Sequence, residues 1–205
     1  ELMTSATITD RLVALSRALI GRIRGGLAQV NVLVSMFFAG MNGSVVADTA
    51  TVGALVLPAM KKAGYPAAFS AAVTGVSSTI GGIIPPSIMM IVLANATEIS
   101  IASLFAAGII PGVLIGVVIM VINHYFAVKY NFERSDQPFS VRRAGKELYR
   151  SSFALLIPLV LVGSVMGGVA SVVEAGAITA LVALFTGVFV YRTIKWKDCT
   201  GAFRR

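Results

Sequence analysis

The residues best suited to chemistry lie in one stretch, Ser77-Ser-Thr-Ile-Gly-Gly-Ile-Ile-Pro-Pro-Ser87. Apolar helical sequence precedes and follows it, and its two glycines and two prolines predict a break between two half-helices. At membrane depth, unwound backbone is tolerated only where it is buried in protein or lines a cavity, and such breaks mark ion and substrate sites in secondary transporters. A proline kink packed against its neighbours is the alternative, and the break alone does not separate the two.

A second candidate is Asp48, which follows a short polar turn at Asn42-Gly43-Ser44. The turn joins two apolar arms, Leu27–Met41 and Val46–Met60, each of 15 residues. Such an arm is roughly 22 Å of helix against roughly 30 Å of hydrocarbon, and basic residues flank both outer ends, so we expect a re-entrant hairpin. An acidic residue near its tip is costly unless it faces a cavity, a cation or hydrogen-bond donors. The alternative is that Asp48 caps the second arm.

The remaining candidates do not favour catalysis. His124 is the sole histidine, with no cysteine beside it to build a transition-metal site, and we interpret it as an interfacial hydrogen-bonding residue. An intramembrane protease needs two membrane carboxylates, or a base beside Ser44, whereas Asp48 is the one carboxylate expected to be buried and His124 lies in a different span. We therefore expect no catalytic residue and no organic cofactor. A channel is harder to exclude, because broken helices also line pores.

The placement of charge predicts the membrane sidedness. The 205 residues are 57% hydrophobic and 13% charged, with a net charge of +8 that would suggest nucleic acid in a soluble chain. However, no Lys or Arg occurs between Ala63 and Val128 or between Ser151 and Tyr191. All seventeen basic residues fall in four patches, which is the pattern of cytoplasmic loops. The single cysteine, Cys199, excludes an internal disulfide.

These observations predict an all-α polytopic membrane protein. In the third apolar region we expect Ile101–Ala107 to lie along the interface and Pro111 to open the span. The predicted segments are a cytoplasmic-surface amphipathic helix (1–26), a re-entrant hairpin (27–64), a broken transmembrane helix (65–98), a transmembrane helix (99–130), a cytoplasmic linker (131–150), two further transmembrane helices (151–194) and a cytoplasmic tail (195–205).

Several motifs together point to a family. They are Phe38-Ala-Gly-Met-Asn-Gly-Ser-Val-Val-Ala-Asp48, Ala71-Ala-Val-Thr-Gly-Val-Ser-Ser-Thr-Ile-Gly81, Ile84-Pro-Pro-Ser87, Arg24-Gly-Gly-Leu-Ala28 and Leu104-Phe-Ala-Ala-Gly-Ile-Ile-Pro-Gly112. In combination they resemble the large membrane subunit of tripartite ATP-independent periplasmic (TRAP) transporters. The chain departs from the family pattern in having Asn42 for a frequent Ser, Gly82 for Pro, and Ser171-Val-Val-Glu-Ala175 for Thr-Pro-Thr-Glu-Ala.

The resemblance implies a fold and a function. The family's large subunit is about twice as long and is built from two inverted repeats, so the chain is expected to be a fragment that covers most of the first repeat and the start of the second. The implied fold is an elevator-type transporter. The implied activity is sodium-coupled import of a small organic acid, of C4-dicarboxylate, keto acid or sialic-acid type, across the bacterial inner membrane. A periplasmic substrate-binding protein would deliver the solute, and a small membrane subunit would brace the large one. A channel and, less favoured, an intramembrane protease remain the alternatives.

The resemblance also implies a sodium site where the hairpin tip meets the helix break. Hard cations such as sodium prefer oxygen ligands, and helix N-termini near Val46 and at Ser87 suit a substrate carboxylate. The expected sodium-binding residues are Asn42, Gly43, Ser44, Asp48, Ser77, Ser78, Thr79 and Gly81. The expected substrate-binding residues are Ile84, Pro85, Pro86 and Ser87. Asp48 would either bind the ion or brace the hairpin.

The one-sided distribution of basic residues gives a topology prediction. Cysteines introduced as Ser135→Cys and Ser140→Cys should react with a membrane-impermeant thiol reagent only from the cytoplasmic side, because they lie in the basic segment. Thr97→Cys should react only from the periplasmic side. The measurement compares labelling of each cysteine in intact cells with labelling in inverted membrane vesicles. Labelling of Ser135→Cys in intact cells would contradict the predicted number of spans.

Overall fold

The computed structural model describes the chain at residues 8–20, 23–132 and 140–186. These residues form helices with short connections and contain no strand, which confirms the all-α prediction for the described part of the chain. The predicted cytoplasmic tail and the end of the last predicted span lie outside these residues. In chain order the elements are α2 (Ile8–Ile20), α3 (Gly26–Asn42), α4 (Val45–Lys62), α5 (Ala67–Ser78), the short 3-10 helix η1 (Thr79–Gly82), α6 (Ile88–Thr97), α7 (Ile101–Lys129), α8 (Val141–Met166) and α9 (Val172–Phe185).

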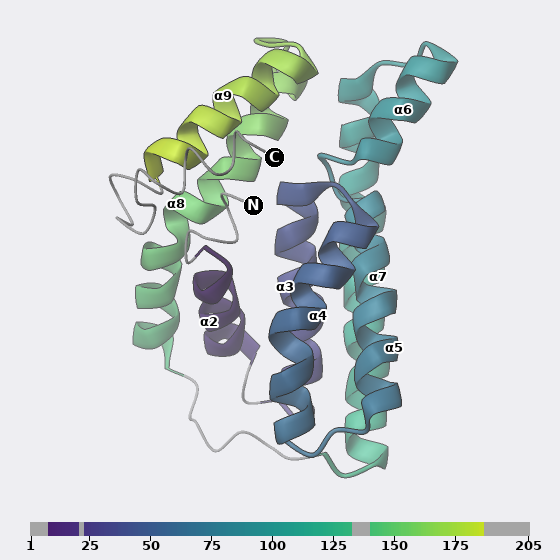
Figure 1. The fold of residues 1–205 in the computed structure, drawn as a ribbon, viewed down its shortest axis with the longest axis vertical. Coiled ribbons are helices and arrows are strands. Elements are labelled where there is room, and N and C mark those ends of the chain that lie inside the picture. Colours follow the sequence, from purple (N-terminus) through teal and green to yellow (C-terminus); the bar gives the residue numbers. More distant parts are fainter. Residues whose placement is uncertain (1–7, 21–22, 133–139, 187–205) are drawn as a thin grey trace.

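Helices α3 and α4 form a hairpin, and α5, η1 and α6 form a broken helix beside it (Figure 1). The hairpin turns at about the height where α5 gives way to α6, and α7 runs past both halves of the broken helix. The α4–α5 connection and the end of α7 lie at one end of the molecule, and the α6–α7 and α8–α9 connections lie at the other. The basic pair Lys61–Lys62 and Lys129 therefore share one end, as their charge pattern predicts.

Serine side chains start most of these helices. Each of these serines stands at the N-cap and accepts a hydrogen bond from the backbone N–H three residues later, which satisfies one of the free donors of the first turn. At Ser171 the Glu174 carboxylate also accepts from the Ser171 N–H, 2.8 Å, to complete a capping box. The N-cap serines are Ser44, Ser87, Ser100, Ser140 and Ser171.

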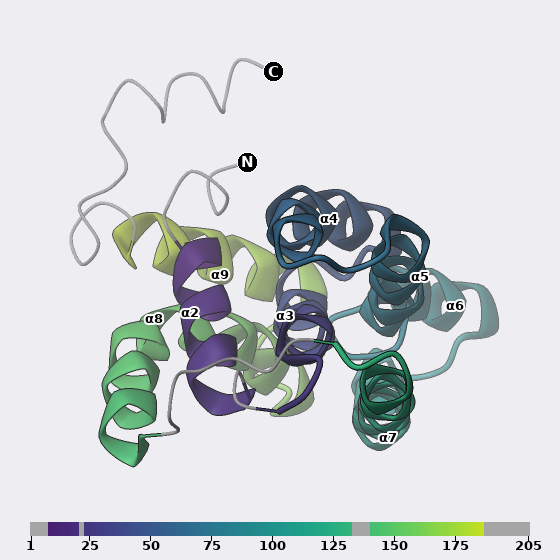
Figure 2. The same ribbon diagram turned by 90° about the horizontal axis from the view of Figure 1, so that it is seen from below.

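Helix α3 occupies the centre of the molecule. Viewed along the long axis, it lies between α2, α8 and α9 on one side and α4, α5 and α7 on the other (Figure 2). Its surroundings explain why Val30, Val32 and Val34 are all buried although they do not share one helical face. The Gln29 amide donates to the Met120 carbonyl of α7, 2.8 Å, so polar as well as apolar contacts hold the centre.

Two long helices begin differently from the sequence-based expectation. Helix α7 is continuous from Ile101, so Ile101–Ala107 forms its first turns and Pro111 lies inside it. Pro111 removes one backbone hydrogen bond, but Gly108 and Gly112 flank it and lie against Met90, Ile83 and Ile84 of the broken helix, so packing holds the helix together. Helix α8 begins at Val141 and runs without interruption into the span expected from residue 151, so the end of the predicted linker forms its first turns.

Apolar side chains cover much of the outer surface. Among the described helices, α7 and α8 are long and apolar enough to cross a membrane, judged by length and composition. Ile110, Leu114 and Val121 of α7 are more than half exposed, as are Leu159 of α8 and Leu181 of α9. Such a surface suits hydrocarbon or another apolar protein surface better than water.

The close contact between α7 and the helix break can be tested at Gly108. A Cβ at this position would lie 2.5 Å from the Ile83 carbonyl oxygen, which is backbone and cannot rotate away. We expect Gly108→Ala to destabilise the full-length protein by about 1–3 kcal/mol, the usual cost of overpacking. Thermal unfolding of the purified protein measures this.

Gly75→Ala is the matched control, because Gly75 is also helical and a Cβ there would meet nothing within 4 Å. It should be neutral or stabilise by roughly 0.4–1 kcal/mol, as for alanine replacing glycine in an unstrained helix. Equal melting temperatures for the two variants would contradict the packing described here.

Candidate functional site

The hairpin tip lies directly against the helix break. The Ile88 N–H, in the first turn of α6, donates to the Gly43 carbonyl, 3.0 Å. Gly43 ends α3 with φ of 59°, a left-handed conformation in which glycine is favoured. A Cβ at Gly43 would also overlap the Pro86 carbonyl oxygen. Both the backbone conformation and the close approach therefore require glycine at the tip.

The glycines of the break face the start of α4 on the other side of the tip. A Cβ on Gly81 would touch the Ser44 carbonyl at 3.6 Å, and one on Gly82 would lie 3.3 Å from a Val45 methyl. The start of α4 thus packs over η1 almost backbone to backbone. Of the predicted sodium-binding residues, the structure brings Gly43, Ser44 and Gly81 together here, with Asn42 half-buried at the end of α3.

The predicted substrate-binding residues divide into two groups. Pro86 contacts the hairpin tip. Ser87 links the two sides of the break, because its hydroxyl donates to the Gly82 carbonyl, 2.7 Å, and accepts from the Met90 N–H, 3.4 Å. Ile84 instead lies against α7, where its side chain fills the space left by Gly112. In this arrangement Ile84 packs against α7, and Ser87 fixes the start of α6.

Asp48 is buried between α4 and its neighbours without a hydrogen-bond partner. Its side chain is fully buried, and among the described residues neither carboxylate oxygen has a partner in hydrogen-bond geometry. The Ser35 and Ser78 hydroxyls lie close enough to this carboxylate to stabilise its charge, although the buried Ser78 hydroxyl makes no hydrogen bond of good geometry. The alternative that Asp48 caps the second arm is wrong, because Ser44 is the N-cap and its hydroxyl accepts from the Ala47 N–H, 3.4 Å.

Ser77 belongs to a polar network that the sequence analysis missed. Its hydroxyl shares a hydrogen bond with Ser35, 3.1 Å, and donates to the Asn31 side-chain oxygen, 3.3 Å. The Asn31 amide in turn donates to the Thr74 hydroxyl, 2.7 Å. All four side chains are buried, and they join α3 to α5. We name Asn31, Ser35, Thr74 and Ser77 the polar seam.

A sequence signal for the polar seam exists. Asn31 and Ser35 are four residues apart in an otherwise apolar arm, and Thr74 and Ser77 are three apart, so each pair lies on one helical face. Polar residues repeated at helical spacing inside an apolar helix predict a buried partner. Thr79 shows the limit of such reasoning, because it is exposed and its hydroxyl donates to the Val76 carbonyl at the end of α5, 2.7 Å.

The arrangement suits a small cation. A buried carboxylate is costly unless it is paired or neutralised, and Asp48 has oxygen-bearing neighbours but no basic group among its described contacts. A hard cation prefers such an oxygen-rich environment. No group of three or more His, Cys, Asp or Glu side chains gathers in the described residues. Carbonyls and hydroxyls would therefore have to supply most of the ligands.

Comparison with known proteins identifies the family. Residues 1–205 match the family described as tripartite ATP-independent periplasmic transporter, DctM component. The chain belongs to this family of TRAP transporter proteins. It is 36% identical to the C4-dicarboxylate TRAP transporter large permease protein of Pseudomonas aeruginosa over 197 residues. This alignment covers 96% of this chain and 46% of that protein.

The names of other relatives refer to different solutes. The sialic acid TRAP transporter large permease protein of Vibrio cholerae is 35% identical over 194 residues, covering 95% of this chain and 45% of that protein. The 2,3-diketo-L-gulonate TRAP transporter large permease protein of Escherichia coli is 36% identical over 206 residues, covering 98% and 48%. The chain thus spans about half the length of these TRAP permeases, which are transporters and not enzymes.

The contact between tip and break predicts an unequal effect of alanine at two left-handed glycines. Gly43→Ala should destabilise the full-length TRAP permease through left-handed strain, roughly 1–2 kcal/mol, and through overlap with Pro86. Gly64→Ala is the matched control, with φ of 80° but nothing within 4 Å of its Cβ, so only the strain applies. Thermal unfolding of both purified variants should give the larger loss for Gly43→Ala. Equal losses would show that the tip does not depend on this contact.

Proposed function

We propose that this chain forms about half of the large permease of a TRAP transporter that imports small organic acids with sodium. Membership of the family carries the transporter class. The observation that carries the ion site is the hairpin tip against the helix break, with a buried and unpartnered carboxylate beside it. In this proposal the protein lies in the bacterial inner membrane as a multi-pass protein, and α3 and α4 form a re-entrant hairpin.

The proposed sodium site lies between α3, α4 and the start of the break. Ser44, through its hydroxyl or carbonyl, and the backbone near Gly81 offer neutral oxygen ligands, as does the unpartnered Ser78 hydroxyl. Asp48 supplies the negative charge. Binding of a cation removes the cost of burying that carboxylate alone, so the ion stabilises the joined tip and break.

The proposed substrate is a carboxylate anion. The relatives named for C4-dicarboxylate, sialic acid and 2,3-diketo-L-gulonate all concern organic acids, which supports this class of solute. Helix α6 begins at Ile88 and α4 begins at Val45, and both starts meet at the break. Helix N-termini carry partial positive charge and attract carboxylates.

The remaining parts of the proposal follow from the family. A periplasmic substrate-binding protein delivers the acid, and a small membrane subunit supports the large permease. The hairpin and the broken helix move together as an elevator against the rest of the protein. The hydrogen bond between Ile88 and Gly43 supports this, because it links the two elements at their irregular points.

The sodium site is tested in the complete transporter, reconstituted with its partner subunits. Ser78→Ala and Asp48→Asn should raise the sodium concentration for half-maximal uptake several-fold, because each removes an oxygen ligand or the charge that holds the ion. Uptake of a radiolabelled C4-dicarboxylate at varied sodium concentration measures this.

Thr49→Val is the matched control. Thr49 lies one residue from Asp48 on α4, but it is exposed and its hydroxyl donates to the Val45 carbonyl of its own helix. Its sodium dependence should equal that of the unmodified transporter. Unchanged sodium dependence in Ser78→Ala and Asp48→Asn would overturn the site, and conductance without the periplasmic protein would favour a channel.

A further inference from the structure

The start of α8 carries a basic face that the proposed transport mechanism does not use. Arg142, Lys146 and Tyr149 are four and three residues apart, so they lie on one face of the helix. All three are exposed, Tyr149 to 81%. We name Arg142, Lys146 and Tyr149 the basic face.

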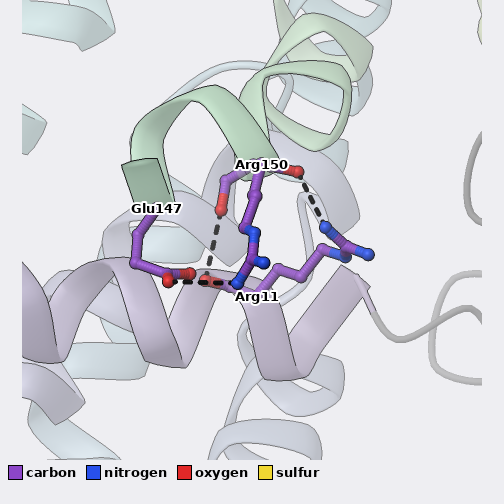
Figure 3. Close-up of polar contacts among 4 residues, drawn as sticks. Arg11, Glu147 and Arg150 are labelled. Atoms are coloured by element: carbon purple, nitrogen blue, oxygen red, sulfur yellow. Dashed lines mark hydrogen bonds and ion pairs between the residues drawn. The ribbon is translucent and has the colours of Figure 1, made fainter. Parts of the chain in front are cut away.

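The opposite side of α8 packs against α2. Ala144 and Ser151 are buried, and the Ser151 hydroxyl donates to the Arg11 carbonyl of α2, 3.3 Å. The Arg11 guanidinium donates to the Arg150 carbonyl, 3.2 Å, so the two helices are joined in both directions (Figure 3). These contacts fix the rotation of α8 and hold the basic face on the outside.

No acidic side chain of this segment shares the basic face. Glu147 is the one acidic residue between Val141 and Arg150. It lies toward the α2 side, its side chain is 18% exposed, and it pairs with Arg150 at 3.6 Å (Figure 3). The positive charge of Arg142 and Lys146 is therefore not neutralised from within α8.

The length of α8 places the basic face at the level of lipid headgroups. A span needs about 20 helical residues to cross the hydrocarbon. Helix α8 has 26 residues and ends at Met166, immediately before the turn that leads to α9. Counting back twenty residues from Met166 reaches Glu147, so Val141–Lys146 lie outside the hydrocarbon. Tyr149 lies near the boundary, at the level of the Glu147–Arg150 pair, where tyrosine is favoured.

Exposed apolar residues border the basic face. Val141 is 75% exposed and Leu148 is 51% exposed, and both lie on the side of Tyr149 away from Arg150. A purely solvated linker has no reason to place them there. A helix with an apolar strip beside a basic strip is suited to the surface of a membrane.

We propose that the basic face of α8 binds the headgroup of an anionic phospholipid. The lipid phosphate lies between Arg142 and Lys146, and the Tyr149 ring packs at the top of the acyl chains. Charge complementarity favours an anionic lipid over a neutral one, because each Lys or Arg near an anionic membrane surface contributes about 1 kcal/mol of attraction. The lipid then anchors the start of α8, and through α8 also α2, at the membrane surface. The proposal goes beyond transport and needs only that α8 spans the membrane.

The test uses the full-length permease with its small subunit. Tyr149→Trp places a fluorophore on the basic face, with the other tryptophans replaced by phenylalanine. The protein is reconstituted in phosphatidylcholine vesicles that contain either brominated phosphatidylglycerol or the same fraction of brominated phosphatidylcholine. Bromine quenches tryptophan at contact, so the two quenching curves compare occupancy by an anionic and a zwitterionic lipid.

We expect phosphatidylglycerol to be preferred by roughly ten- to thirtyfold at low salt, from two basic residues. The preference should fall as salt is raised. Adding Arg142→Gln and Lys146→Gln should abolish it. The control is Arg142→Lys with Lys146→Arg, which keeps both charges and should keep the preference.

Three results would overturn the proposal. Equal quenching by the two lipids would show no selection for anionic headgroups. A preference that survives the two glutamine substitutions would place its origin elsewhere. Absence of quenching by either lipid would show that a protein, such as the small subunit, covers this face. None of these results depends on sodium coupling or on the transported solute.

Discussion

The hydrogen bond between the Ile88 N–H and the Gly43 carbonyl joins the hairpin tip to the helix break, two of the places where the described chain departs from regular helix. A hairpin tip and a helix break each leave backbone groups without helical partners, and in apolar surroundings such groups are costly. When the tip lies against the break, a free backbone N–H of one bonds to a free carbonyl of the other. The requirement for glycine at position 43 follows from this contact, since any side chain there would meet Pro86. The direction of α4, and with it the burial of Asp48, depends on the same geometry.

The polar seam joins α3 of the hairpin to α5, the first half of the broken helix. Its hydroxyls and amide satisfy one another across α3 and α5, which a buried network must do if it is not to destabilise the protein. Asp48 of α4 and Ser78 of α5 lie beside this network, and neither side chain makes a hydrogen bond of good geometry. The Ser35 and Ser78 hydroxyls lie near the Asp48 carboxylate, and no basic group is among its described contacts. In the proposed function, a bound cation gives this arrangement its physical reason.

The two sides of α3 have different physical characters. Toward α4, α5 and α7 the contacts include the polar seam, the Gln29 hydrogen bond and glycines that bring backbones close. On the other side, α2 and α8 are joined to each other, because the Arg11 and Ser151 side chains each donate to a backbone carbonyl of the opposite helix. The chain spans about half the length of its relatives, and within it this difference distinguishes the part that holds the candidate ion site from the part where α2 and α8 pack together.

Elements whose cause is local can be predicted from the sequence. Glycine, proline and N-cap serine act on their own backbone, so the hairpin turn, the helix break and most helix starts could be predicted from composition and spacing. Charge placement predicted which helix ends share a side. The sequence did not show that α7 continues through Pro111, because packing against the broken helix compensates for the lost hydrogen bond. Which polar groups meet depends on how the helices pack in the folded chain. Asn31 bonds to Thr74 at a separation of 43 residues, Ser44 rather than Asp48 caps α4, and Thr79 donates to the Val76 carbonyl of α5 while Ser78 is buried. These outcomes depend on how three helices are rotated against one another, and no single helix carries that information.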